Sequence, residues 1–155
     1  MKNSRRLALD CWINTVIHHL PHLSKPQAAV LALWSFGMVM TQSCGLSTVS
    51  SFIAQMLNKK ENTVRQQLRE WYWNAEAKKG QRRQALDVSL CFAPLVRWVL
   101  SLWPSTQKRL ALALDATVLK DCFVVLAISI VYRGCAIPVA WTVLSLTTKG
   151  AWKPH

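Results

Sequence analysis

The sequence of residues 110–146 is LALALDATVLKDCFVVLAISIVYRGCAIPVAWTVLSL, and this stretch decides the fold class. It is rich in Val, Ile, Leu and Thr, and short polar breaks divide it into apolar runs of the kind that form β-strands. The runs are Arg109 to Thr117, Cys122 to Tyr132 and Cys135 to Leu146. The second and third do not alternate cleanly, which indicates strands covered on both faces. Pro138 lacks a backbone N–H, so the third strand is predicted to lie at a sheet edge.

The residues before this stretch follow a helical period instead. Ser24 and Gln27 have the spacing of a capping box at the start of one helix, and Pro94 is predicted to kink or break another. The expected helices are Ser4 to Leu20, Pro26 to Met40, Thr48 to Leu57, Asn62 to Trp73, and Asp87 to Trp103. We predict an α+β protein with a helical region over residues 1–103 and a strand region over 104–155, divided at Trp103-Pro104-Ser105.

The composition favours a polyanionic partner. Nineteen Lys and Arg residues against seven Asp and Glu give a net charge of +12, which suits nucleic acid or an anionic membrane surface. The five cysteines form no CxxC pair, and the histidines of the 18–22 region have no second cluster that would complete a tetrahedral metal site. Neither a disulfide framework nor a zinc site is predicted, and a reducing cytoplasmic location is expected.

A small basic membrane protein is one alternative, because Phe123 to Leu146 is almost continuously apolar and long enough to span a bilayer. Arg133 would lie near the middle of such a helix at a cost of about 2.5–3.5 kcal/mol. A turn at Arg133-Gly134 between two strands accommodates both residues. We therefore expect no membrane partner.

A helix pair in the basic region predicts DNA binding. Thr48 to Leu57 and Asn62 to Trp73, joined by a turn at Asn58-Lys59-Lys60-Glu61, have the spacing of a helix-turn-helix. With the apolar stripe of the second helix inward, polar and basic side chains project outward to contact phosphates and base edges. The candidate DNA-binding residues are Lys59, Lys60, Asn62, Arg65, Gln66, Arg69, Arg82 and Arg83. The alternative is a solvated basic face of an ordinary helical hairpin.

Asp115 is the candidate catalytic and metal-binding residue. It is predicted to end an apolar strand, where a carboxylate can be presented to the divalent cations of phosphoryl transfer. The alternative is a turn or cap residue that accepts backbone N–H groups around Thr117. Asp121, beside Lys120, is interpreted as part of a surface turn.

Two segments, Leu112 to Thr117 and Val131 to Trp141, together resemble the start of the catalytic domain in insertion-sequence DDE transposases of group four and their relatives. The resemblance implies a ribonuclease-H-like, retroviral-integrase-like fold whose first three strands form an antiparallel meander. It also implies a preceding helical domain that binds the ends of the element. Asp115 would be the first of three ligands for Mg²⁺ or Mn²⁺ in a complete relative.

The sequence departs from that family because no acidic residue follows Asp121, so the second Asp and the Glu of the triad are missing. We therefore expect an N-terminal transposase fragment that binds DNA, is inactive alone in strand cleavage, and is a possible homodimer. The main rival is a non-enzymatic helix-turn-helix regulator whose strands form a dimerisation or ligand module.

Overall fold

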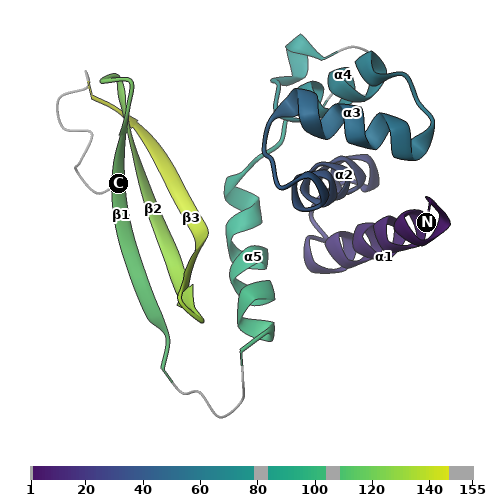
Figure 1. The fold of residues 1–155 in the computed structure, drawn as a ribbon. Coiled ribbons are helices and arrows are strands. Elements are labelled where there is room, and N and C mark those ends of the chain that lie inside the picture. The colour runs from purple at the N-terminus through teal and green to yellow at the C-terminus, as the bar shows by residue number, and fades with distance from the viewer. Residues whose placement is uncertain (1, 79–83, 104–108, 147–155) are drawn as a thin grey trace. The chain divides into compact units, whose positions relative to one another are not determined.

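A computed structural model describes residues 2–78, 84–103 and 109–146. Within these ranges helices come first and strands last, which confirms the α+β class (Figure 1). The elements are α1 (Lys2–His19), α2 (Lys25–Thr41), α3 (Leu46–Leu57), α4 (Glu61–Trp71), a 3₁₀ helix η1 (Ala75–Ala77), α5 (Ser89–Ser101), β1 (Ala111–Leu119), β2 (Phe123–Tyr132) and β3 (Cys135–Ser145). The chain divides into two compact units, Met1–Cys91 and Phe92–His155.

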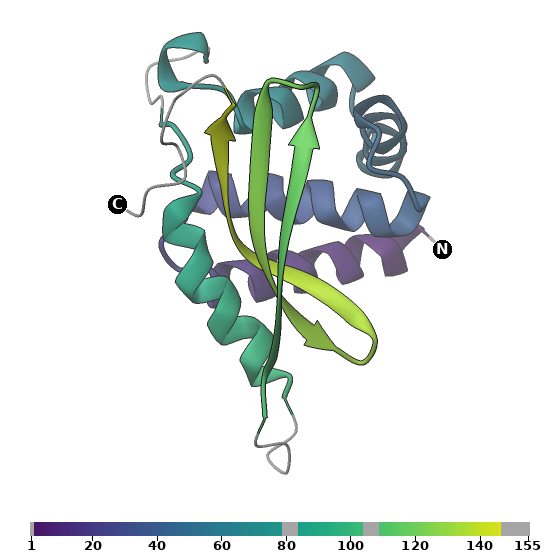
Figure 2. The ribbon, with the colours of Figure 1, turned by 90° about the vertical axis from the view of Figure 1, so that its left-hand side faces the viewer.

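In the first unit α1 and α2 lie side by side (Figure 2). The predicted capping box at the start of α2 is confirmed. The Ser24 hydroxyl accepts from the Gln27 backbone N–H, and the Gln27 side-chain oxygen accepts from the Ser24 backbone N–H at 3.0 Å. Two of the N–H groups that a helix start leaves unpaired are thereby satisfied.

The core of this unit lies between the helices. Its buried side chains are Leu9, Val30, Leu33, Val49, Ile53, Ala54, Val64 and Leu68. Gly37 of α2 lets the α3 side chains approach closely, since a Cβ on Gly37 would lie 2.7 Å from Cγ1 of Val49. The two helices therefore pack at a separation that only a glycine allows at this point.

α3 and α4 are joined by a tight turn. α3 ends at Leu57, and the next residue, Asn58, adopts the left-handed conformation with φ of 55°, a conformation that Asn tolerates better than most residues. α4 then begins at Glu61 and ends at Trp71, two residues before the predicted Trp73. The Trp71 indole N–H donates to the Gln27 carbonyl at 3.0 Å, which ties the end of α4 to the start of α2.

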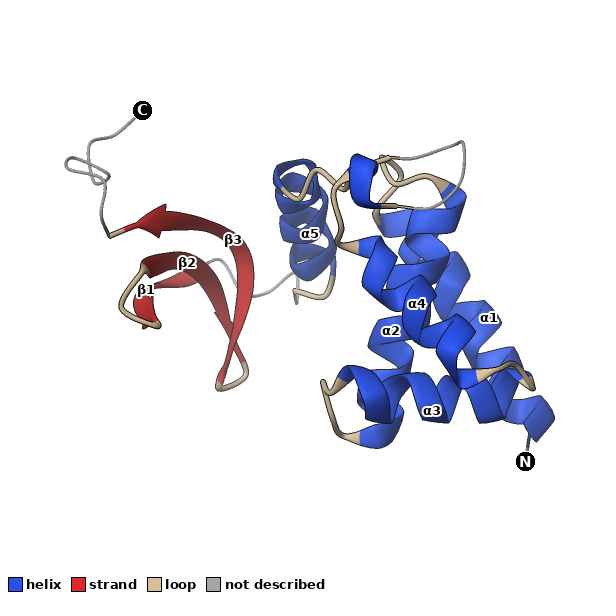
Figure 3. Ribbon diagram, turned by 90° about the horizontal axis from the view of Figure 1, so that it is seen from above, coloured by secondary structure: helices blue, strands red, loops and turns tan. Residues whose placement is uncertain are grey.

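The second unit contains a three-stranded antiparallel sheet in the order β1-β2-β3 (Figure 3). Arg133 and Gly134 both have positive φ, 49° and 80°, as a two-residue type I′ hairpin turn requires. The predicted turn is therefore confirmed, and so is the edge position of β3. The register shifts between Ile128 and Ser129, opposite the part of β3 that contains Pro138.

α5 contributes to the core of the second unit, where Val99 packs with Ile130 and Val139. The two units consequently divide after Cys91, not at Trp103 where the sequence suggested a boundary. α5 also continues through Pro94, so the helix is not broken at this residue.

The expectation that the second and third strands are covered on both faces is not met along their whole length. In β2, Ile128 and Val131 are 43% and 37% exposed. In β3, Val143 is 56% exposed. The apolar composition of these strands therefore does not reflect burial among the described residues.

The segment Phe123 to Leu146 forms β2, a turn and β3. Among the described helices none has by itself the length and hydropathy of a membrane span. The pair α2 and α3 passes that test only together, with a bend of 100° between them.

The close approach at Gly37 predicts that Gly37→Ala destabilises the protein. Overpacking typically costs about 1–3 kcal/mol, whereas Ala is intrinsically favoured over Gly in a helix by about 1 kcal/mol. We expect a net loss of about 1 kcal/mol, measured by urea unfolding followed by circular dichroism.

A double-mutant cycle supplies the control, because Val49→Ala removes the methyl group that the new Cβ would meet. In the Val49→Ala background, Gly37→Ala should become neutral or stabilising. The same destabilisation in both backgrounds would contradict a clash between these two side chains.

Candidate nucleic-acid interface and carboxylate site

α4 is oriented by its apolar side. Val64 and Leu68 are buried, at 1% and 0% exposure, and residues on a helix repeat every 3.6 positions. Asn62, Gln66 and Arg69 therefore lie on the opposite side, and we call these three residues the outer face of α4. Asn62 and Arg69 are exposed and Gln66 is half-buried.

The sequence predicts that Arg65 projects outward, but its side chain is held along the helix. Its guanidinium forms an ion pair with Glu61 one turn earlier, with Nη2 and Oε1 at 3.0 Å. Its Nε atom is buried and has no hydrogen-bond partner among the described residues. Both side chains are more than a third exposed, so the pair contributes little to stability, but it restricts where Arg65 can reach.

Two further contacts order the outer face. The Gln66 side-chain amide donates to the Glu70 carboxylate, with Nε2 and Oε1 at 2.7 Å. The Arg69 guanidinium lies over the Trp73 ring, 5.0 Å from its centroid, within the range of a cation–π contact. A guanidinium stacked in this way keeps N–H donors in its plane for a ligand.

The turn before α4 contains two lysines. Lys59 and Lys60 are both exposed, and Lys60 occupies the N-cap position without a side-chain cap. The backbone N–H groups of a helix start and its dipole favour anions. Arg82 and Arg83, which were also predicted to bind DNA, lie outside the described residues.

An open groove of about 940 Å³ runs beside this face, between α4 and the start of α2. Its polar lining includes amide, indole and carboxylate groups, which belong to Gln27, Gln66, Gln67, Trp71 and Glu70. The sequence prediction did not include Glu70 or Trp73. Their four-residue spacing from Gln66 and Arg69 was the available signal, because side chains at i and i+4 are neighbours on a helix.

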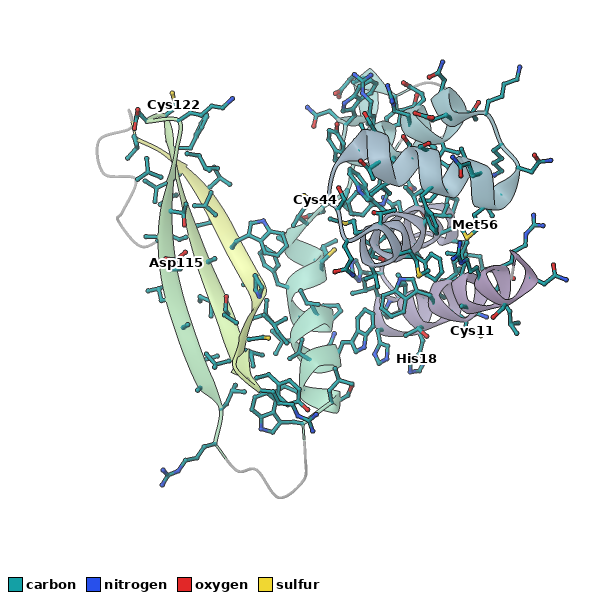
Figure 4. All side chains as sticks on the ribbon, viewed as in Figure 1. Cys11, His18, Cys44, Met56, Asp115 and Cys122 are labelled. Atoms are coloured by element: carbon teal, nitrogen blue, oxygen red, sulfur yellow. The ribbon has the colours of Figure 1, made fainter. Side chains whose placement is uncertain are left out.

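Asp115 lies within β1, opposite Ala127, because β1 continues to Leu119 (Figure 4). It therefore does not end the strand as predicted. Its carboxylate is exposed and accepts from the Thr117 hydroxyl at 3.0 Å. This contact also differs from the alternative prediction of a turn residue that accepts backbone N–H groups.

The donor set around Asp115 does not fit a catalytic Mg²⁺ or Mn²⁺ site. Within the described ranges there is no group of three His, Cys, Asp or Glu residues that could hold a metal ion. Asp121 lies in the loop after β1, where it and Lys120 have positive φ of 54° and 50°, as expected for a surface turn. One carboxylate alone does not form the two-metal arrangement of strand cleavage.

A Cys–His pair lies elsewhere in the first unit, with His22 Nε2 and Cys91 Sγ at 3.2 Å. Burial, and secondarily the charge of Asp87, raises the pKa of the Cys91 thiol. The thiolate is the nucleophilic form of cysteine, so a raised pKa disfavours the form of Cys91 that would attack a substrate.

The chain was compared with family models, curated proteins and solved structures. None of the three comparisons finds a match.

The isolated carboxylate predicts that this chain does not cleave DNA. With Mg²⁺ or Mn²⁺ and supercoiled plasmid, the wild-type chain and Asp115→Asn should show the same background nicking. Metal-dependent nicking by the wild type that Asp115→Asn abolishes would contradict the prediction.

Proposed function

We propose that the chain is the N-terminal part of an insertion-sequence DDE transposase, and that its helical unit binds DNA at the ends of the element through α4. The observation that carries the proposal is the outer face of α4, where two amide-bearing side chains and one guanidinium-bearing side chain lie opposite the buried Val64 and Leu68. These are the groups that recognise adenine and guanine edges in the major groove.

In this proposal α3, the turn and α4 act as a helix-turn-helix. The left-handed Asn58 allows the chain to reverse within three residues, so the two helices pack while α4 keeps its outer face accessible. Lys59 and Lys60 would contact the DNA phosphates that flank the major groove into which α4 would insert. Such contacts position the protein, and the outer face supplies sequence preference.

The second unit would be the beginning of a ribonuclease-H-like nuclease domain. Its support is the antiparallel meander β1-β2-β3 with Asp115 on the first strand. In a complete relative, a second Asp and a Glu would join this carboxylate and hold Mg²⁺ or Mn²⁺ for strand cleavage and transfer. We assign no catalytic step to the present chain, because Asp115 has no such partners among the described residues.

A non-enzymatic helix-turn-helix regulator is the second candidate. The hydrogen bond between Asp115 and Thr117 favours it, since the carboxylate has a hydroxyl partner without a metal ion. Both candidates bind DNA, and the coding sequence downstream distinguishes them. Further strands with an Asp and a Glu would favour the transposase.

The phosphate contacts predict a strong salt dependence of DNA binding. For Lys59→Ala/Lys60→Ala, the slope of log binding constant against log salt concentration should become shallower by about 2, because each lost phosphate contact changes it by about 0.9. Fluorescence anisotropy with a duplex at several salt concentrations measures this slope.

The matched control is Arg6→Ala/Arg97→Ala, which removes the same charge from exposed positions on α1 and α5. Its slope should stay close to that of the wild type. An equal change in both double variants would mean that binding follows net charge alone and would overturn the assignment of the interface to the α4 region.

A further inference from the structure

We infer that Glu70 is a positioning residue that orients the Gln66 amide to recognise an adenine in duplex DNA. The inference rests on the proposed function and names the base that one residue of the outer face contacts. Its basis is the hydrogen bond of 2.7 Å between Gln66 Nε2 and Glu70 Oε1.

A carboxylate can only accept hydrogen bonds, whereas an amide has an accepting oxygen and a donating NH₂ group. The NH₂ group of Gln66 must therefore be the end that faces Glu70. The orientation of an amide is ordinarily ambiguous by a half-turn, but here the chemistry of the neighbour removes the ambiguity. Gln66 Oε1 and the second N–H of Nε2 are left to bind a ligand.

This pair of free groups matches adenine. In the major groove adenine presents the N6 amine as donor and N7 as acceptor. Gln66 Oε1 can accept from N6 while the second N–H donates to N7, and the first N–H stays on Glu70. Guanine presents two acceptors at the same positions, so its O6 would face Gln66 Oε1 without a hydrogen between them.

The surroundings of Gln66 leave it accessible from one side. Gln66 and Glu70 both line the open groove beside α4, and Asn62, one turn earlier, is exposed on the same face. Arg69 is ordered separately by its stacking on Trp73. Glu70 therefore affects base preference through Gln66, and its negative charge weakens rather than strengthens contact with the phosphates.

The test is selection of bound sequences from a random duplex library, with the full chain as wild type, Glu70→Asp, Glu70→Gln, Glu70→Ala and Gln66→Ala. The wild type should prefer adenine over guanine by about tenfold at one position. Glu70→Asp keeps an acceptor-only carboxylate at helical i, i+4 spacing, where Gln–Asp hydrogen bonds form, and should keep the preference.

Glu70→Gln keeps the size of the side chain, but its amide can donate as well as accept a hydrogen bond. The Gln66 amide is then no longer held in one orientation. Glu70→Ala removes the partner altogether. Both remove the same charge, and both should bind DNA at least as tightly as wild type while the adenine preference falls towards twofold or less. Glu70→Ala should cause no further loss in the Gln66→Ala background.

Three results would overturn the inference. An adenine preference that survives in Glu70→Ala but is lost in Gln66→Ala would mean that Gln66 needs no positioning. A preference unaffected by Gln66→Ala would place base recognition elsewhere, with DNA binding intact. A wild-type chain that enriches no DNA would overturn the proposed function and this inference with it. Circular dichroism melts of each variant verify that α4 remains folded.

Discussion

The burial of Val64 and Leu68 against the helical core determines how α4 is presented. Because both side chains are almost fully buried beside Val49 and Ile53 of α3, α4 cannot rotate about its axis without exposing them. Each would lose about 1.5–3 kcal/mol of burial free energy on full exposure. The hydrogen bond from the Trp71 indole N–H to the Gln27 carbonyl holds the C-terminal end of α4. The identity of the outward residues follows from this packing.

α4 carries acidic side chains although the chain as a whole is strongly basic. The chain as a whole carries a net charge of +12, yet Glu61 and Glu70 lie on α4 itself and contact Arg65 and Gln66. These carboxylates restrict the side chains that they contact, and in the proposed DNA complex they would weaken general attraction to phosphates. A DNA interface of the proposed kind would lose some affinity for phosphates but gain a defined arrangement of donors and acceptors, which is the requirement for distinguishing one base from another.

Features that depend on local chemistry could be predicted from the sequence. The capping box at Ser24 and the turn at Arg133-Gly134 each involve a few neighbouring residues whose conformational preferences are strong. The end of the first unit at Cys91 could not be predicted, because it depends on the packing of Val99 against a sheet that follows later in the chain. Arg65 differs, because its ion pair with Glu61 has the i, i+4 spacing of helix neighbours and could have been predicted from the sequence.

Asp115 illustrates the difference between a motif and a site. It lies on the first strand of a meander, as the resemblance to DDE transposases implies, but its observed partner is a threonine hydroxyl. The DNA-binding proposal does not depend on this residue. It depends on α4, where packing, charge and hydrogen bonding all involve the same short helix.

Hydrogen exchange measured by mass spectrometry, with and without a bound duplex, tests most directly whether α4 is the interface. We predict slower exchange in residues 58–73 on DNA binding and little change in β1, β2 and β3. Protection confined to the strands or to α1, with residues 58–73 unchanged, would contradict the assignment.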